Sequence, residues 1–295
     1  MAIDPSTLDW TSARRVSYLL RQSFRYEYPE PIRDLSHRLV VIPPERFGDQ
    51  RRLRHQLSVD ADGVRFEDRK DRFGNVIVDV FAPRVAGAIE FTAEVSVERH
   101  AAEPNRLADG WLADGYLLEP SPLTTADDRI RAAAESLAGS ADWGLALADR
   151  INDWVYQSMT YQHGVTGVRT TAAEALTLGQ GVCQDYAHVM LSACRLLDIP
   201  ARYVSGHLLG EGGSHAWIEV LRRVPGRRRH WVAEGWDPAN NRRTGAGYVT
   251  VATGRDYADV APMSGAYDGV GISGTLIVTK QVRQVDVDPD LALSS

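Results

Sequence analysis

The chain has 295 residues, of which 44% are hydrophobic and 24% are charged, and its formal net charge is −6. This composition is that of an ordinary globular protein and excludes collagen, a coiled coil and a disordered chain, while the length predicts about two domains. No run of 18 apolar residues is present, and the first twenty residues lack the apolar core of a signal peptide. We therefore expect a cytoplasmic protein that binds no membrane. The net negative charge gives no indication that the protein binds nucleic acid.

The first hundred residues predict an antiparallel β domain. Short segments with alternating apolar side chains are separated by Pro, Gly and Asp-rich turns. The expected strands cover residues 21–28, 35–42, 52–59, 63–66, 75–81 and 88–97. Several short strands at this spacing predict a sandwich-like domain, which we place at residues 12–102.

Residues 101–122 are rich in Pro and Gly and predict a connector, and the pattern then becomes helical. The expected helices cover residues 125–138, 142–159, 171–178 and the segment from Cys183 to Pro200, and the strands that follow cover 201–209, 215–223 and 229–236. This order predicts an α+β core, residues 122–253, with helices packed on an antiparallel sheet. Residues 254–295 return to β structure, and this C-terminal extension packs either on the core or on the N-terminal domain.

The two cysteines, Cys183 and Cys194, lie on one predicted helix, three turns and therefore about 16 Å apart. A disulfide needs Cα atoms within about 7 Å, so we expect two free thiols. The same distance prevents both sulfurs from binding one zinc ion together with Asp185, His188 or His207, and no CxxC motif is present. We therefore expect no metal and no cofactor.

Cys183 lies where a glycine-containing loop meets the first turn of the predicted helix. Unpaired backbone N–H groups and the positive end of the helix dipole favour a thiolate there and could hold a developing oxyanion. The negative charge of Asp185 opposes this effect. Considered alone, Cys183 is better interpreted as a buried structural thiol.

His215 and Asp237 favour the catalytic interpretation of Cys183. If the turn of the hairpin is centred on residue 226, His215 lies directly opposite Asp237, with Cβ atoms about 5 Å apart. A slip of one residue would make the pair diagonal. A carboxylate that orients an imidazole beside a thiol is the arrangement that nucleophilic thiol catalysis requires. We therefore predict that the catalytic residues are Cys183, His215 and Asp237.

The stretches GVCQDYAHVMLSACRLLDIPARYVSGH, SHAWIEV and GWDPANN resemble the bacterial transglutaminase-like superfamily. In that family a cysteine, a histidine and an aspartate occur in this order on a papain-like core, and the matching positions are Cys183, His215 and Asp237. The segments RYEYPEPIRDLSHRLVVIPP and DRFGNVIVDVF resemble the β domain that precedes this core, and GRDYADVAPMSGAY extends the match beyond it. The resemblance therefore covers nearly the whole chain, and no catalytic position is lost.

The resemblance implies acyl transfer through a cysteine thioester. Members of the superfamily include amide cross-linkers, deamidases, peptidases and glycanases. We expect hydrolysis of a protein or peptide amide, because an amine must compete with water for the thioester. The alternatives are transamidation or deamidation of protein glutamine and, in a different class, an inactive binding or assembly module that keeps the fold. The sequence does not indicate the oligomeric state.

Overall fold

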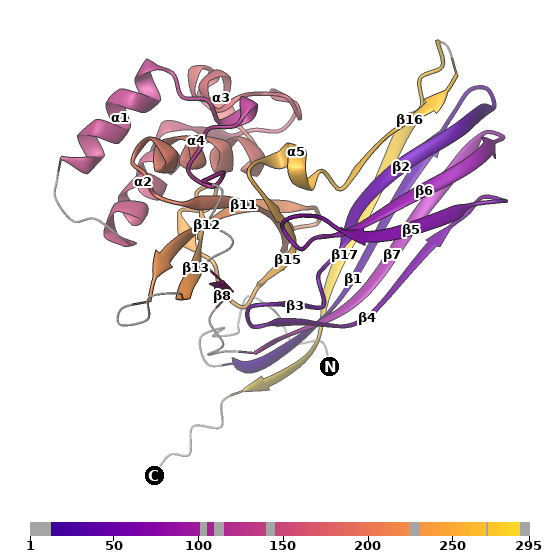
Figure 1. Cartoon of the computed structure of the whole chain (residues 1–295), viewed down its shortest axis with the longest axis horizontal. Coiled ribbons are helices and arrows are strands. Elements are labelled where there is room, and N and C mark those ends of the chain that lie inside the picture. Colours follow the sequence, from indigo (N-terminus) through magenta and orange to yellow (C-terminus); the bar gives the residue numbers. More distant parts are fainter. Residues whose placement is uncertain are drawn as a thin grey trace.

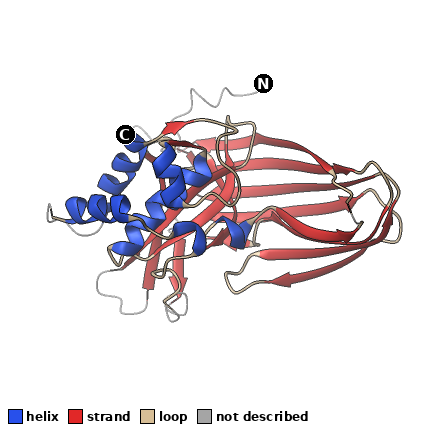
Figure 2. Cartoon of the chain, turned by 90° about the horizontal axis from the view of Figure 1, so that it is seen from above, coloured by secondary structure: helices blue, strands red, loops and turns tan. Residues whose placement is uncertain are grey.

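A computed structural model describes residues 13–100, 105–108, 115–139, 145–224, 230–269 and 271–289. The described chain is mostly sheet, and its few helices gather at one end of the molecule while long strands form the other end (Figures 1 and 2). Among the described residues, no helix combines the length and apolar character needed to cross a bilayer.

Two antiparallel sheets form the strand-rich end. In order across the first sheet are β17 (Thr275–Pro289), β1 (Ala13–Glu27), β7 (Ala88–His100), β4 (Gln50–Val59) and β3 (Arg46–Phe47). The second sheet contains β16 (Met263–Asp268), β2 (Ile32–Ile42), β6 (Val76–Val85) and β5 (Arg65–Lys70). Side chains of both sheets share one buried cluster, for example Phe24 and Phe91 with Leu39 and Val80. The prediction of N-terminal antiparallel sheets is confirmed.

Both sheets are completed by strands from the C-terminal end of the chain. Strand β17 pairs with β1 along its whole length, and β16 pairs with β2 (Figure 1). This pairing shows that the extension packs on the N-terminal sheets, a point that the sequence left open. The predicted limits at residues 102, 122 and 254 stay predictions.

A third sheet carries the residues that follow the helices. Its strands are, in order, β14 (Arg242–Arg243), β13 (His230–Asp237), β12 (His215–Arg223), β11 (Ala201–Leu208) and β15 (Tyr248–Gly254), and β8 (Asn105–Ala108) pairs with β13. The helical segments are η3 (Pro122–Thr124), α1 (Asp128–Ala138), α2 (Leu145–Ser158), α3 (Ala172–Leu178), α4 (Cys183–Leu196) and α5 (Tyr257–Val260). Val189 and Met190 of α4 share a fully buried cluster with Ile151 of α2 and Ile218 of β12. A short parallel pair joins β9 (Thr160–Tyr161) to β10 (Gln180–Gly181).

Two local predictions differ from the structure. The expected connector at 101–122 contains strand β8, while residues 101–104 and 109–114 lie outside the described residues. The helix expected at 142–159 corresponds to α2, Leu145–Ser158, and residues 142–144 also lie outside the described residues. The strand expected at 63–66 is β5, Arg65–Lys70, whose side chains are all exposed. Its charged sequence lacks the apolar alternation of a half-buried strand, as is common at a sheet edge.

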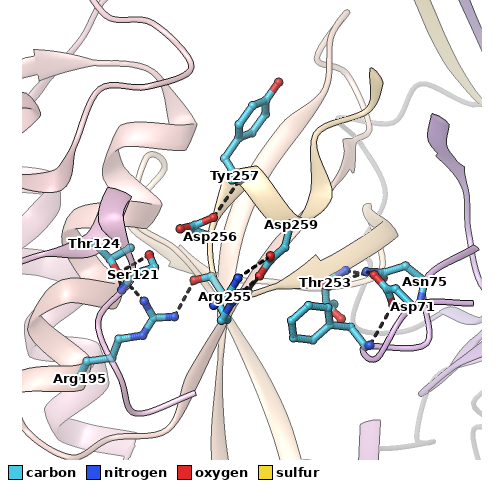
Figure 3. Close-up of polar contacts among 12 residues, drawn as sticks. Asp71, Asn75, Ser121, Thr124, Arg195, Thr253, Arg255, Asp256, Tyr257 and Asp259 are labelled. Atoms are coloured by element: carbon cyan, nitrogen blue, oxygen red, sulfur yellow. Dashed lines mark hydrogen bonds and ion pairs between the residues drawn. The ribbon is translucent and has the colours of Figure 1, made fainter. Parts of the chain in front are cut away.

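The free edge of β15 is covered by amide side chains from the N-terminal sheets. Gln50 donates to the carbonyl of Thr250 at 2.7 Å and accepts from its N–H at 2.9 Å. Asn75 makes the same pair of bonds with Thr253, at 2.7 and 2.8 Å (Figure 3). An amide side chain carries both an N–H donor and a carbonyl acceptor, so it can replace a strand partner. These contacts hold the third sheet against the N-terminal sheets.

Candidate active site

Cys183 is the first residue of α4 and is 9% exposed. Helix α3 ends at Gly179, whose φ of +64° is in the left-handed region that glycine adopts readily. The chain then forms β10, which pairs with β9 so that Gly181 lies beside Tyr161. Val182 is extended and serves as the N-cap, and the thiol therefore starts the helix as the sequence predicted.

Asp185 fixes the backbone just before Cys183. Its Oδ2 accepts from the Val182 N–H at 2.8 Å and from the Thr166 hydroxyl at 2.7 Å. A Cβ on Gly181 would lie 2.5 Å from this oxygen, so only glycine allows the carboxylate to fold back over the loop. Asp185 is fully buried, and burial raises the pKa of its carboxyl.

His215 and Asp237 meet, although their register differs from the prediction. His215 begins β12 and Asp237 ends β13, but the ladder pairs Ile218 with Trp236, a register that does not place His215 opposite Asp237. The expectation that His215 lies directly opposite Asp237 is wrong, and the pair is diagonal. Side chains on one face still reach each other diagonally, and the His215 Nε2–H donates to Asp237 Oδ2 at 2.7 Å. The turn itself, at 225–229, lies outside the described residues.

Asp237 is fully buried and has several donors besides His215. The Tyr248 hydroxyl donates to it at 2.7 Å and the Asn240 side-chain amide at 2.8 Å, while the Ala239 N–H donates at 3.1 Å. Burial opposes ionisation, but the contacts with His215, Tyr248 and Asn240 outweigh it and lower the pKa of the Asp237 carboxyl. The carboxylate is therefore held charged and oriented toward His215.

The other ring nitrogen of His215 lies beside Glu211. Its Nδ1 lies 3.0 Å from Glu211 Oε2, and the imidazole also interacts with the Cys183 thiol. Burial lowers the pKa of His215, but the contacts with Asp237, Cys183 and Glu211 exceed this effect and raise it. Contact with His215 in turn lowers the pKa of Glu211. Trp217 stacks on the imidazole, with ring centroids 6.3 Å apart.

Cys183 and His215 line a cavity of about 430 Å³ between the third sheet and the N-terminal sheets. Phe24 and Lys280 enter it from β1 and β17, and Tyr257 of α5 forms another wall. The remaining lining residues are Tyr26, Tyr161, His163, Val182, Gln184, Tyr203, Ser205, Gly213, Ser214, Ala216, Pro262, Met263, Leu276 and Val278.

The wall formed by Tyr257 is anchored to α4. The Tyr257 N–H donates to His188 Nε2 at 3.2 Å, and the carbonyl of Arg255 accepts from Arg195 at 2.5 Å. Figure 3 shows this segment between Arg195 on one side and Asn75 on the other. Because both contacts come from α4, the helix that begins with the thiol also positions the opposite wall of the cavity.

Four residues of the site were missed by the sequence reasoning. Tyr248 binds Asp237, Glu211 faces His215, and burial together with the adjacent Cys183 thiol raises the pKa of Tyr161. The fourth is Lys280. A carboxylate four residues before His215 was a usable signal for Glu211, whereas Tyr161 and Lys280 reach the site only through strand pairing between distant segments.

Cys194 plays no part in this arrangement. Its side chain is fully buried in the core, and burial raises the pKa of its thiol to about 12. Both cysteines are free, as expected. His188 is engaged with Tyr257 and His207 contacts the carbonyl of Gly213 at 3.3 Å. Over the part of the chain that the structure describes, no group of three His, Cys, Asp or Glu residues is arranged to hold a metal ion.

The fold and the site define a protein of two antiparallel sheets joined to a third, helix-bearing sheet, with a thiol at a helix N-terminus beside a histidine–aspartate pair. Comparison identifies the family. Residues 131–240 match the Transglutaminase-like superfamily, and residues 18–98 match the Bacterial transglutaminase-like N-terminal region. The chain belongs to the transglutaminase-like superfamily and carries its bacterial N-terminal domain.

Several relatives and one solved structure are similar to the chain. An uncharacterized protein of Mycobacterium leprae is 31% identical, over 72% of this chain and 80% of the relative. An uncharacterized protein of Mycobacterium bovis is 26% identical, over 84% and 86%. The crystal structure of a candidate cysteine protease from Cytophaga hutchinsonii has a TM-score of 0.75 and 22% identity, covering 93% of this chain and 92% of that one. This likeness shows that the fold is shared.

Proposed function

We propose that this protein is a thiol-dependent amide or peptide hydrolase in which Cys183 is the nucleophile, His215 the general acid and base, and Asp237 the residue that orients His215. The observation that supports the proposal most directly is the position of the His215 imidazole. Its Nε2–H donates to the buried Asp237 carboxylate at 2.7 Å, and the imidazole also interacts with the Cys183 thiol. The position of the thiol at the N-terminus of a helix favours the same chemistry.

The first half of the reaction forms a thioester. The Cys183 thiolate attacks the carbonyl carbon of the amide, so an S–C bond forms and the carbonyl electrons move to oxygen. Backbone N–H groups in the first turn of α4 are suited to bind this oxyanion. The C–N bond then breaks, and the His215 imidazolium gives its proton to the leaving amine.

The second half releases the acyl group. Neutral His215 removes a proton from water, the resulting hydroxide attacks the thioester carbonyl, and the C–S bond breaks. The products are a carboxylic acid and the Cys183 thiolate, beside an imidazolium that Asp237 stabilises. An amine that replaces water at this step gives transamidation, and water attack on an acyl group derived from glutamine gives deamidation. We propose hydrolysis because water is present in large excess.

The test is alkylation of the two cysteines by iodoacetamide at pH 6.5, followed by peptide mass spectrometry. An ordinary thiol titrates near pH 8.5 and reacts slowly under these conditions. Cys183 is expected to react at least about tenfold faster than a free cysteine peptide and to lose this advantage in His215→Ala. Cys194, buried in the same chain, is the internal control and should not react.

Turnover is tested with a panel of peptide p-nitroanilides. Release of p-nitroaniline by the wild type, and its absence in Cys183→Ala, would support the hydrolase. Incorporation of dansylcadaverine into casein without hydrolysis would identify a transamidase instead. If Cys183 reacts with iodoacetamide no faster than an ordinary thiol, the hydrolase proposal fails, and a binding module becomes the better interpretation.

A further inference from the structure

Lys280 places an ammonium group in the same cavity as Cys183. It lies on β17, opposite Gln22 of β1, and its side chain is partly buried. The Nζ atom is 5.4 Å from the centroid of the Phe24 ring, which forms another part of the wall. The chain contains only one other lysine, Lys70, which is exposed on β5.

This ammonium lacks a protein counter-ion. Within the described residues, Lys280 forms no ion pair with a carboxylate, and the wall of the cavity contains no Asp or Glu. The titratable groups of the wall are the thiol of Cys183, the imidazoles of His163 and His215, and the phenols of four tyrosines (Tyr26, Tyr161, Tyr203 and Tyr257), and the buried His207 also interacts with Lys280. Burial lowers the pKa of Lys280 to about 8, and the Cys183 thiol opposes this effect. A cation that is partly removed from water and has no counter-ion is destabilised, so a bound anion would offset the cost.

The rest of the cavity is suited to bind the apolar part of a small organic molecule. Phe24, Tyr26 and Tyr203 provide aromatic surface, and Met263 with Val278 provides aliphatic surface. A volume of about 430 Å³ lies in the range of small-molecule sites and is far below that of a folded protein segment. The lining thus combines apolar side chains, the Lys280 ammonium and the Cys183 thiol.

We propose that Lys280 is the specificity-determining residue of this cavity, and that it binds a carboxylate carried by the amide substrate. The substrate class is then a short peptide or acylated amino acid with a free carboxylate close to the amide that Cys183 attacks. This inference rests on the proposed function, because it assigns the substrate class of the same site. Lys280 contacts the carboxylate and takes no part in bond making or breaking.

The test compares iodoacetate with iodoacetamide as probes of Cys183. The two reagents have nearly the same size and differ in that one carries a carboxylate where the other carries a carboxamide. Each forms an S–C bond to Cys183 and releases iodide, so the ratio of the two rates measures the preference for an anion next to the thiol. The rates are measured at pH 6.5, by mass spectrometry of the Cys183 peptide.

In Lys280→Met, the iodoacetate-to-iodoacetamide ratio is expected to fall about tenfold, the order of a lost hydrogen bond to a charged group. Lys280→Arg should keep most of the preference, because it retains the positive charge. Lys70→Met removes the other lysine from an exposed strand and should leave the ratio unchanged. Part of the preference should remain in every variant, since the His215 imidazolium also attracts anions.

The outcomes separate the two proposals. If Lys280→Met changes neither rate, or lowers both equally, Lys280 binds no anion at the site and the inference is overturned while the hydrolase proposal stands. If the wild-type Cys183 reacts with neither reagent faster than a free thiol, the proposed function itself fails. Should Lys280→Met not fold, Lys280→Gln, which retains a polar side chain, gives the same comparison.

Discussion

At the scale of single residues, His215 lies between two carboxylates of very different exposure. The Asp237 side chain is 0% exposed and its oxygen lies 2.7 Å from Nε2, whereas the Glu211 side chain is 40% exposed and lies 3.0 Å from Nδ1. Solvent screens an exposed ion pair far more than a buried one. Asp237 is thus the dominant support of the imidazolium, and Glu211 supports it more weakly from the Nδ1 side.

This asymmetry predicts how the pH profile of Cys183 alkylation responds to each carboxylate. Contact with Asp237 raises the pKa of His215, so Asp237→Asn lowers it and fewer imidazolium ions remain to stabilise the thiolate. The alkylation rate at pH 6.5 should fall by about tenfold or more, and the profile should move up toward the range of an ordinary thiol near pH 8.5.

Glu211→Gln is the matched comparison for Asp237→Asn. Because water already screens Glu211, its removal should change the rate at pH 6.5 less than about threefold. Rates measured from pH 5 to 9 in both variants decide the order of the two effects. An equal or larger effect of Glu211→Gln would show that Asp237 is not the dominant support.

At the scale of elements, the region best predicted from the sequence is the helix that begins with Cys183. Its apolar spacing and the glycine-containing loop before it are local signals, and α4 begins at the expected residue. The register of the β12–β13 hairpin was not predictable in the same way, because it depends on the length of the turn, which the sequence does not fix. The contact between His215 and Asp237 was still predicted, since a diagonal pair on one face remains within reach.

The residues that form the wall of the cavity could not be predicted from the sequence. Lys280 and Phe24 come together because β17 pairs with β1 across nearly the whole length of the chain. The sequence predicted β structure in residues 254–295, but no local signal indicates which strand a segment of it joins. The substrate side of the site therefore depends on long-range pairing, whereas the proposed catalytic side depends largely on local motifs.

The loop before α4 supplies a prediction at this scale. In Gly181→Ala, the new Cβ would meet Asp185, which is fixed by Val182 and Thr166, so the loop has to move. We expect the free energy of unfolding to fall by about 1–3 kcal/mol, as for other overpacked sites, and Cys183 alkylation to slow. Thermal and urea denaturation measure the first effect, and mass spectrometry measures the second.

Gly167→Ala is the control for Gly181→Ala. Gly167 lies in the preceding loop, its φ is not in the left-handed region, and a Cβ there would meet nothing within 4 Å. Its stability should stay within about 0.5 kcal/mol of the wild type. If both alanine variants behave alike, the close approach of Asp185 does not constrain the loop.

At the scale of the whole molecule, the cavity exists because the third sheet is fixed against sheets built from both ends of the chain. The thiol and imidazole come from α4 and β12, while Lys280 and Phe24 come from β17 and β1. Gln50 and Asn75 join these parts by pairing with the edge of β15. Coverage of this edge therefore helps to fix the spacing between the two sides of the proposed substrate site.

Gln50→Ala tests that dependence. The substitution leaves the N–H and carbonyl of Thr250 without the partners that Gln50 supplies, in a position that is only 6% exposed. Each unsatisfied buried group costs about 1–3 kcal/mol, so the free energy of unfolding should fall by about 2–6 kcal/mol, and the Thr250 amide should exchange with deuterium faster. Gln56→Ala, at an exposed position on the same strand β4, should change neither quantity.

Because Cys183 and His215 lie on the other side of the interface, iodoacetamide should still react with Cys183 in Gln50→Ala, while the preference for iodoacetate should weaken as Lys280 moves away. A Gln50→Ala protein that keeps both its stability and its anion preference would show that the edge contacts do not hold the cavity together.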